Sequence, residues 1–223
     1  MTPRELRADV PGLQDGAYLN FGAHGPSPEY VVDAVSDAVA DHEFGSGTDD
    51  PYETAFDGYD RARERVAAFI GADPAEVALT ESTTDGINRV ANAIDFEPGD
   101  VVVRTDLEHP AGVLPWQQRT REGLDVRVVE TDNGRIDLDA YTEAVADARL
   151  VCFSAVTWTH GTQLPVAELV DIAHDAGAFT LVDAVQVPGQ LPMDVHEWGA
   201  DAVVAAGHKW LLGPWGSGFL YVD

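Results

Sequence analysis

The sequence FTLVDAVQ, at residues 179–186, is a short apolar run that ends in a carboxylate. Similar runs lie at 77–79, 101–103, 126–129, 150–156 and 202–205, and the last apolar segment, 217–223, also has the pattern of a strand. Helical patterns lie between them at 85–94, 111–122, 137–148 and 166–176, after two more at 31–44 and 53–71. Strands separated by helices of about ten to fifteen residues form βαβ units. We therefore predict an α/β fold, a three-layer α/β/α sandwich with a mainly parallel sheet.

The composition predicts a globular protein with a strongly acidic surface. Hydrophobic residues make up 45% of the chain, and 39 acidic against 13 basic residues give a formal net charge of −26. Such a surface repels phosphate backbones and anionic lipids, so we expect neither nucleic-acid nor membrane binding. It also suggests adaptation to high salt, which screens the self-repulsion. The sequence has neither an apolar run long enough for a membrane helix nor a signal-peptide pattern at its start, so we expect a cytoplasmic protein.

Several classes of site are disfavoured. Cys152 is the only cysteine and lies in an apolar run, which predicts a buried thiol rather than a catalytic one. The seven histidines lack the spacing of common metal motifs, so no metal site is expected. The sequence contains neither a Walker A motif nor a Rossmann fingerprint, which disfavours a nucleotide-binding domain.

Polar residues follow the predicted strands, and in parallel sheets ligands bind beyond these ends. Thr83 and Thr84 lie where a helix begins after the first strand, in a position to hold a phosphate or simply to cap the helix. His109 follows the second strand in Glu108-His109-Pro110 and is either a functional group or an ordinary loop histidine.

Two further groups follow later strands. Asp183 ends a buried strand, where a carboxylate needs a cation or hydrogen bonds, and it begins the pattern Asp-x-x-Gln that ends at Gln186. Lys209 follows His208 and is the only lysine among the 13 basic residues, although its surroundings are mostly apolar. Unlike arginine, a lysine amine in such a place can lose its proton and attack a carbonyl.

With these motifs the sequence resembles the class V aminotransferase and cysteine desulfurase family of fold-type I enzymes, which depend on pyridoxal 5'-phosphate (PLP). The resemblance extends from Tyr18 to the final strand and is most specific at Asp183-Ala184-Val185-Gln186 and Gly207-His208-Lys209. It implies that Lys209 forms a Schiff base with PLP and later moves the substrate Cα proton, with a pKa lowered by burial and by the cationic ring. Asp183 would then pair with the pyridine nitrogen.

The resemblance assigns the remaining residues to the cofactor as well. Gln186 would bind the ring hydroxyl oxygen, His109 would stack on the ring, and the phosphate would be held by Thr83 and Thr84, with His208 contributing beside the lysine. The substrate would be an amino acid, and the full-length protein a homodimer.

The chain departs from the desulfurase pattern at two positions. Ala206 replaces a phosphate-binding serine and Trp158 replaces an asparagine near the ring oxygen, which favours lyase or epimerase branches slightly and leaves transaminase and desulfurase open. Family members are about twice as long, so residues 1–223 are expected to be a truncated chain. They would form the PLP-binding large domain with an N-terminal helical segment over about 1–75, and the small C-terminal domain would be missing. The alternative is a non-catalytic fragment or scaffold of the same fold.

Overall fold

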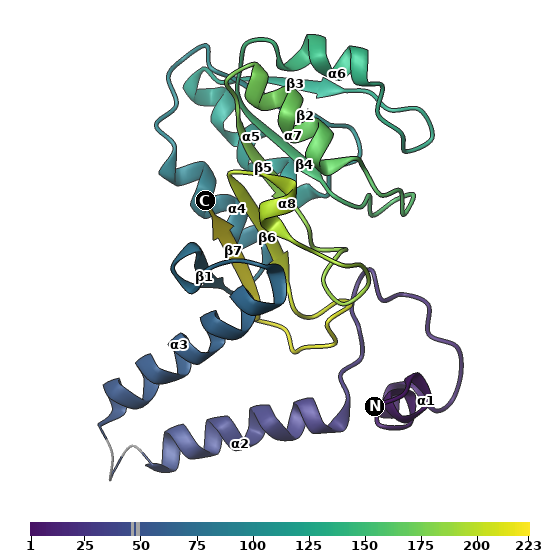
Figure 1. The fold of residues 1–223 in the computed structure, drawn as a ribbon, viewed down its shortest axis with the longest axis vertical. Helices are drawn as coiled ribbons and strands as arrows, with labels where there is room; N and C mark the ends of the chain where they lie inside the picture. Colours follow the sequence, from purple (N-terminus) through teal and green to yellow (C-terminus); the bar gives the residue numbers. More distant parts are fainter. Residues whose placement is uncertain (46, 48–49) are drawn as a thin grey trace.

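The computed structural model describes residues 1–45, 47 and 50–223 and has three layers, as predicted (Figure 1). The strands are β1 (Val77–Thr80), β2 (Val101–Thr105), β3 (Asp125–Val129), β4 (Ala148–Ser154), β5 (Phe179–Asp183), β6 (Ala202–Ala206) and β7 (Gly218–Val222). The α-helices are α1 (Pro3–Ala8), α2 (Glu29–Gly45), α3 (Pro51–Ile70), α4 (Thr83–Ala93), α5 (Leu114–Arg119), α6 (Leu138–Val145), α7 (Val166–Asp175) and α8 (Val195–Trp198). Short 3₁₀ turns are η1 (Pro11–Leu13), η2 (Pro74–Glu76), η3 (Pro110–Gly112) and η4 (Thr120–Glu122).

The strands form one sheet in the order β1-β7-β6-β5-β4-β2-β3. Strands β2 to β6 pair in parallel, whereas β7 is antiparallel to both β6 and β1. The prediction of a mainly parallel sheet is confirmed. Because β2, β4, β5 and β6 run in one direction, the residues that follow them meet at one edge of the sheet.

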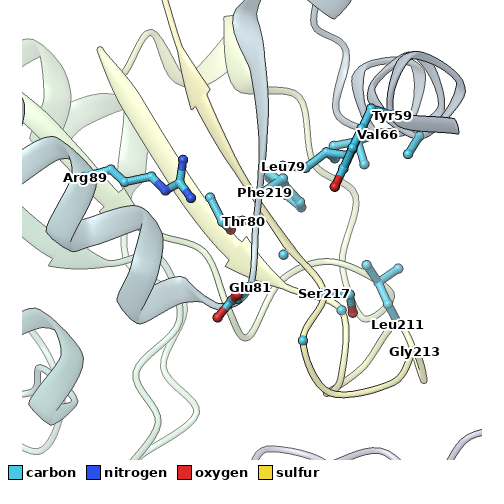
Figure 2. A pocket seen from close by; sticks show the side chains of 14 residues that line it. Tyr59, Val66, Leu79, Thr80, Glu81, Arg89, Leu211, Gly213, Ser217 and Phe219 are labelled. Atoms are coloured by element: carbon cyan, nitrogen blue, oxygen red, sulfur yellow. The ribbon is translucent and has the colours of Figure 1, made fainter. Parts of the chain in front are cut away.

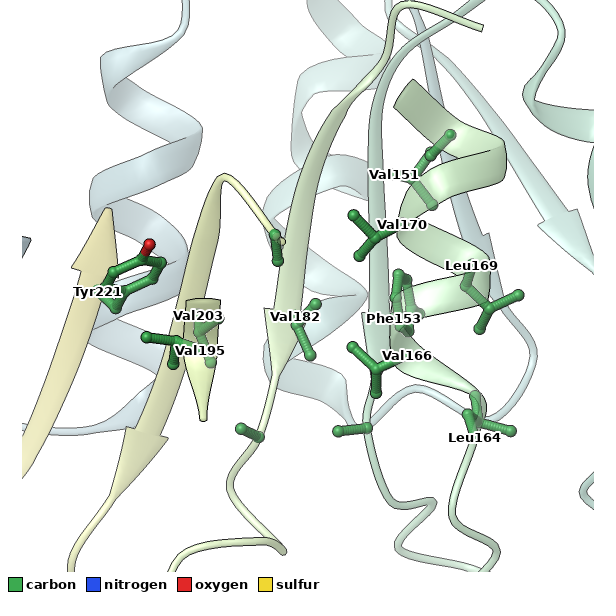
Figure 3. Close-up of a cluster of buried hydrophobic side chains, with 14 of the residues drawn as sticks. Val151, Phe153, Leu164, Val166, Leu169, Val170, Val182, Val195, Val203 and Tyr221 are labelled. Atoms are coloured by element: carbon green, nitrogen blue, oxygen red, sulfur yellow. The ribbon is translucent and has the colours of Figure 1, made fainter. Parts of the chain in front are cut away.

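Each face of the sheet has its own apolar core. One core joins α3, α6 and α7 to the strands. Figure 3 shows Val151, Phe153 and Val182 of the strands near Val166 and Val170 of α7, and Val203 near Val195 of α8. The other core lies under α4 and α5 and includes Trp116. Strands buried on both faces read as continuous apolar runs, which explains why the sequence pattern located them.

One predicted helix is interrupted. The sequence pattern predicts a single helix over 111–122, but the structure has η3, α5 and η4 in succession there. Pro115 lacks an amide hydrogen and its ring crowds the preceding turn, so a helix begun before Leu114 cannot continue through it. The other predicted helices agree with α2, α3, α4, α6 and α7 to within a few residues at their ends.

Local signals fix the ends of the longest helix. Asp50 precedes α3 and accepts hydrogen bonds from the amides of Tyr52 and Glu53, and Gly71 ends the helix with a φ of 77°. Together α2 and α3 extend away from the sheet (Figure 1), and every residue of α2 keeps part of its surface exposed. None of the helices in the described part of the chain is long and apolar enough to cross a bilayer.

Candidate functional site

A pocket of about 450 Å³ lies beyond the carboxyl ends of the parallel strands. It contains every residue that the sequence singled out as a cofactor contact: Thr83, Thr84, His109, Asp183, Gln186, His208 and Lys209. Asp183 is the last residue of β5, and the others lie in the segments that follow β1, β2, β5 and β6. The fold therefore gathers, from positions more than a hundred residues apart in the chain, one concave group of polar side chains.

Lys209 and Asp183 form the electrostatic centre of this pocket. Asp183 is 2% exposed, and its Oδ1 accepts a hydrogen bond from the amide of Val185 at 2.9 Å. Burial raises the pKa of Asp183 to about 6, although the Val185 amide and the charge of Lys209 oppose the rise. Burial lowers the pKa of Lys209, and the nearby Asp183 opposes that change. A carboxylate that lacks enough compensation can bind a cationic ring atom, and a lysine with a lowered pKa can act as a free amine.

Gln186 is already bound at both ends of its amide. Its Oε1 accepts from Trp210 Nε1 at 2.6 Å, and its Nε2 donates to the carbonyl of Gly22 at 3.0 Å. The second hydrogen on Nε2 is the group left for a ligand oxygen. This arrangement holds the side chain in one orientation, so a contact to a cofactor would require no further ordering of Gln186.

Two aromatic pairs form the walls of the pocket. His109 meets Trp158 edge to face at 5.4 Å, and its Nδ1 accepts from the Ala111 amide at 3.3 Å. Trp215 stacks on His208, with ring centroids 3.9 Å apart. Trp158 is 52% exposed and Trp215 is 67% exposed, so both indoles leave a broad surface at the pocket mouth. The pKa of His109 lies below its usual value because of partial burial and the charge of Lys209.

Two buried polar atoms in the pocket fit an anionic ligand. Ser82 caps α4 by accepting from the Asp85 amide at 3.1 Å, and Thr83 follows it in the first helical turn. Among the described residues, neither Thr83 Oγ1 nor His208 Nδ1 has a hydrogen-bond partner, and both atoms are buried. Both residues line the pocket, and a phosphate at the start of α4 would meet the positive end of the helix dipole. The residues present thus fit the phosphate of PLP, whereas Ala206 offers no hydroxyl.

The sequence did not reveal that the N-terminal segment forms part of the pocket. Asn20, Gly22 and Ala23 line it, and the Gly25 amide donates to the carbonyl of His208 at 2.8 Å. A Cβ atom on Gly25 would stand 2.0 Å from the carbonyl oxygen of Lys209, so only glycine fits there. The one signal in the sequence was the motif that begins at Tyr18, which marked the resemblance but carried no role.

A larger hollow of about 640 Å³ lies beside β1 and β7 and is shown in Figure 2. Tyr59, Val66, Leu79 and Phe219 give it mostly apolar walls. Its charged residues are Glu81 and Arg89, and Arg89 is engaged by Asp85 at 2.9 Å. Among the residues that the structure describes, the larger hollow contains no counterpart of the pair formed by Lys209 and Asp183. We therefore take the smaller pocket as the candidate site.

Comparisons with known proteins agree with this geometry. The sequence pattern of the aminotransferase class-V family matches residues 17–223. A probable cysteine desulfurase of Methanothermobacter thermautotrophicus is 39% identical over 99% of this chain and 56% of its own length. The apo structure of a cysteine desulfurase from Thermococcus onnurineus NA1 superposes with a TM-score of 0.90 and 32% identity, covering 100% of this chain and 57% of that one.

A third protein, C-DES, matches in two solved structures. A mutant with glycine covalently linked to its PLP cofactor has a TM-score of 0.87 and 26% identity, covering 97% of this chain and 59% of its own. A complex with cysteine persulfide, in which the protein is called a cystine C-S lyase, has a TM-score of 0.86 and 27% identity, covering 96% of this chain and 59% of its own. The chain thus spans little more than half the length of the proteins that it matches.

Proposed function

The chain belongs to the aminotransferase class-V family, and on that basis we propose that it is the cofactor-binding part of a PLP-dependent enzyme that acts on an amino acid. The observation that carries the proposal is the placement of Lys209 and Asp183 in one pocket, each with a pKa moved by burial. We propose that residues 1–223 form the large domain, with a helical segment over about 1–75 at its N-terminal side.

What the bound cofactor supplies is an electron sink for bonds at the substrate Cα. Asp183 keeps the ring nitrogen protonated, because a buried carboxylate gains most from a cation beside it. Lys209 holds the cofactor through Nζ and, as a free amine, moves the proton at the substrate Cα. Its lowered pKa serves this role, since a base must be unprotonated to accept that proton.

The other residues of the pocket bind and orient. The second Nε2 hydrogen of Gln186 would be available to the ring oxygen, and His109 would offer its ring face. Thr83, Thr84 and His208 would hold the phosphate, and the lack of partners for Thr83 Oγ1 and His208 Nδ1 within the described part of the chain supports this.

The names of the similar proteins support two reactions of sulfur amino acids. The relative from Methanothermobacter is named a probable cysteine desulfurase, and C-DES is called a cystine C-S lyase. Trp158 and Ala206 favour the lyase and epimerase branches slightly, and transaminase and desulfurase chemistry are alternatives within the same family. The second candidate is a non-catalytic remnant that keeps the fold without turnover.

We also propose that the full-length protein is a cytoplasmic homodimer adapted to high salt. The formal charge of −26 supports the salt adaptation, and the single, buried Cys152 suits a reducing compartment. Exposed apolar side chains on the helices that extend from the sheet support a partner surface: Tyr30, Val32, Val35 and Val39 on α2, and Tyr52, Phe56 and Tyr59 on α3.

The test uses the fact that Lys209 is the only lysine. The protein is mixed with PLP in molar KCl, its visible spectrum is recorded, and borohydride is added before peptide mass analysis. We expect a visible band that borohydride removes and a reduced adduct on the peptide that carries Lys209. The variant Lys209→Arg, which keeps the charge, should show neither. A folded wild-type protein without band or adduct would contradict the proposal and favour the non-catalytic remnant.

A further inference from the structure

Glu108 is a buried carboxylate that no role described so far uses. It is 6% exposed and lies between the end of β2 and His109. Its Oε1 accepts from Thr105 Oγ1 at 2.6 Å and from the Ser154 amide at 3.2 Å, and its Oε2 accepts from Ser154 Oγ at 2.6 Å. Thr105 ends β2 and Ser154 ends β4, so one carboxylate joins the ends of two neighbouring strands.

The network is complete on the protein side. Thr105 Oγ1 in turn accepts from the Leu107 amide at 3.1 Å, which fixes its own hydrogen toward Glu108. No ion pair to Glu108 is present among the described residues, so these hydrogen bonds compensate its charge. Burial and the neighbouring Asp183 raise the pKa of Glu108 to about 7, and the hydrogen bonds from Ser154 and Thr105 oppose the rise. Removing the acceptor would leave buried hydroxyls without partners.

The network also lies in contact with the loop that carries His109. Ser154 pairs with Asp183 in the register of β4 and β5, so the carboxylate is anchored one strand away from the centre of the pocket. The loop folds over the carboxylate, since a Cβ on Gly112 would lie 3.5 Å from Glu108 Oε2. Within this loop His109 Nδ1 accepts from the Ala111 amide, which leaves the proton of the neutral ring on Nε2.

We propose that Glu108 is a positioning residue of this site, which fastens the ends of β2 and β4 to each other and thereby fixes where the His109 ring stands in the pocket. Its effect on PLP rests on the function proposed above. The effect on His109 itself is a property of the protein without cofactor, so the two can be judged separately.

The experiment compares three variants in the full chain. Glu108→Ala removes the network. Glu108→Gln keeps it, because the amide oxygen accepts from Thr105 and from the Ser154 amide while the NH₂ group donates to Ser154 Oγ. Asp201→Asn is the matched control: Asp201 Oδ2 accepts from the Thr180 amide and hydroxyl, each at 2.7 Å, beside the first residues of β5 and β6, at the opposite edge of the same sheet.

Two readouts are taken from each variant in molar KCl. The ¹⁵N signals of the His109 ring, assigned with a His109→Gln variant, report its tautomer and pKa in the cofactor-free protein. The dissociation constant of PLP and the circular dichroism of its visible band report how the ring is held.

We expect Glu108→Ala to move the His109 signals, to change the dichroic band and to weaken PLP binding about tenfold, the equivalent of about 1.4 kcal/mol. Glu108→Gln should restore all three, and Asp201→Asn should lower the free energy of unfolding without moving any of them. A folded Glu108→Ala protein with wild-type His109 signals would overturn the proposal.

Ser154→Ala is the milder lesion if Glu108→Ala does not fold. It removes the bond to Oε2 and keeps the backbone amide, so a smaller displacement of the His109 signals is expected, and wild-type signals would again overturn the proposal. If the wild-type protein failed to bind PLP, the proposed function would be lost, whereas the cofactor-free His109 signals would still decide the role of Glu108.

Discussion

Replacing Asp183 with asparagine should stabilise the cofactor-free protein above pH 6. The pKa of Asp183 is raised from 3.8 to about 6, so in this interval the folded protein holds a proton that the unfolded protein has released. The free energy of unfolding therefore falls as pH rises from about 4 to about 6. At about 1.4 kcal/mol for each pKa unit, the loss is about 3 kcal/mol, and roughly half has developed by pH 5.

Asparagine does not ionise and therefore escapes this loss. Its Oδ1 still accepts from the Val185 amide, as the carboxylate does at 2.9 Å, but its NH₂ group needs an acceptor, which costs about 1 kcal/mol. We expect Asp183→Asn to exceed the wild type by about 2 kcal/mol at pH 7.5. The difference at pH 5 should be smaller, because half of the wild-type loss is still absent there. The charge of Asp183 raises the pKa of Glu108, so its removal also relieves the ionised Glu108 at pH 7.5 and acts in the same direction.

The assay is urea unfolding in molar KCl, followed by tryptophan fluorescence at both pH values. With PLP added, the wild type should become the more stable of the two proteins, because only it has a carboxylate to pair with the ring nitrogen. Asp201→Asn controls for the loss of any carboxylate: hydrogen bonds from His174 and Thr180 lower the pKa of Asp201, so its removal should destabilise at pH 7.5. A cofactor-free Asp183→Asn protein less stable than the wild type at pH 7.5 would refute the reasoning, since it would show that the folded protein favours the ionised carboxylate.

Three other results are expected. Gly25→Ala should weaken PLP binding in a fluorescence titration and lower stability, because its Cβ would stand 2.0 Å from the Lys209 carbonyl oxygen. The control Gly16→Ala, with nothing within 4 Å of its Cβ, should bind PLP like the wild type. Equal affinities of the two variants would argue against a contribution of the N-terminal segment to the pocket. Gly58→Ala, in the interior of α3 with nothing within 4 Å, should raise the free energy of unfolding by up to about 1 kcal/mol, and a measured loss would mean that the site is crowded. The free energy of unfolding, measured with urea, should rise steeply between low salt and molar KCl, because salt screens the repulsion that a net charge of −26 produces. A free energy that does not depend on salt would contradict the proposed salt adaptation.

The sequence was sufficient for the features that depend on local pattern. The strands are buried on both faces and therefore form unbroken apolar runs, and the polar residues that follow them share one edge because the strands are parallel. This is why Lys209, Asp183 and His109 could be proposed as neighbours before the structure. The interruption of the predicted helix at Pro115 was also visible in the sequence, but the apolar pattern outweighed it.

Contacts between distant segments could not be read in this way. The double engagement of Gln186 by Trp210 and Gly22 joins three separate parts of the chain, and no periodicity predicts it. The hydrogen bond from Ser154 to Glu108 requires β2 and β4 to be neighbours in the sheet, although β3 lies between them in sequence. Strand order is a tertiary property, and the side-chain partners at a sheet edge follow from it.

The docking of residues 20–25 has a consequence for how the protein is made. Gly22 emerges early from the ribosome, but its partner Gln186 lies 164 residues later, and Gly25 must wait for the still later His208. Contacts of such long sequence separation form slowly, because the chain loses conformational entropy in closing the loop before the contacts contribute any stabilisation. The pocket is thus completed only after the sheet has assembled around it, and a nascent chain with a finished core still lacks one of its walls. Capture of the cofactor would accordingly mark the end of folding.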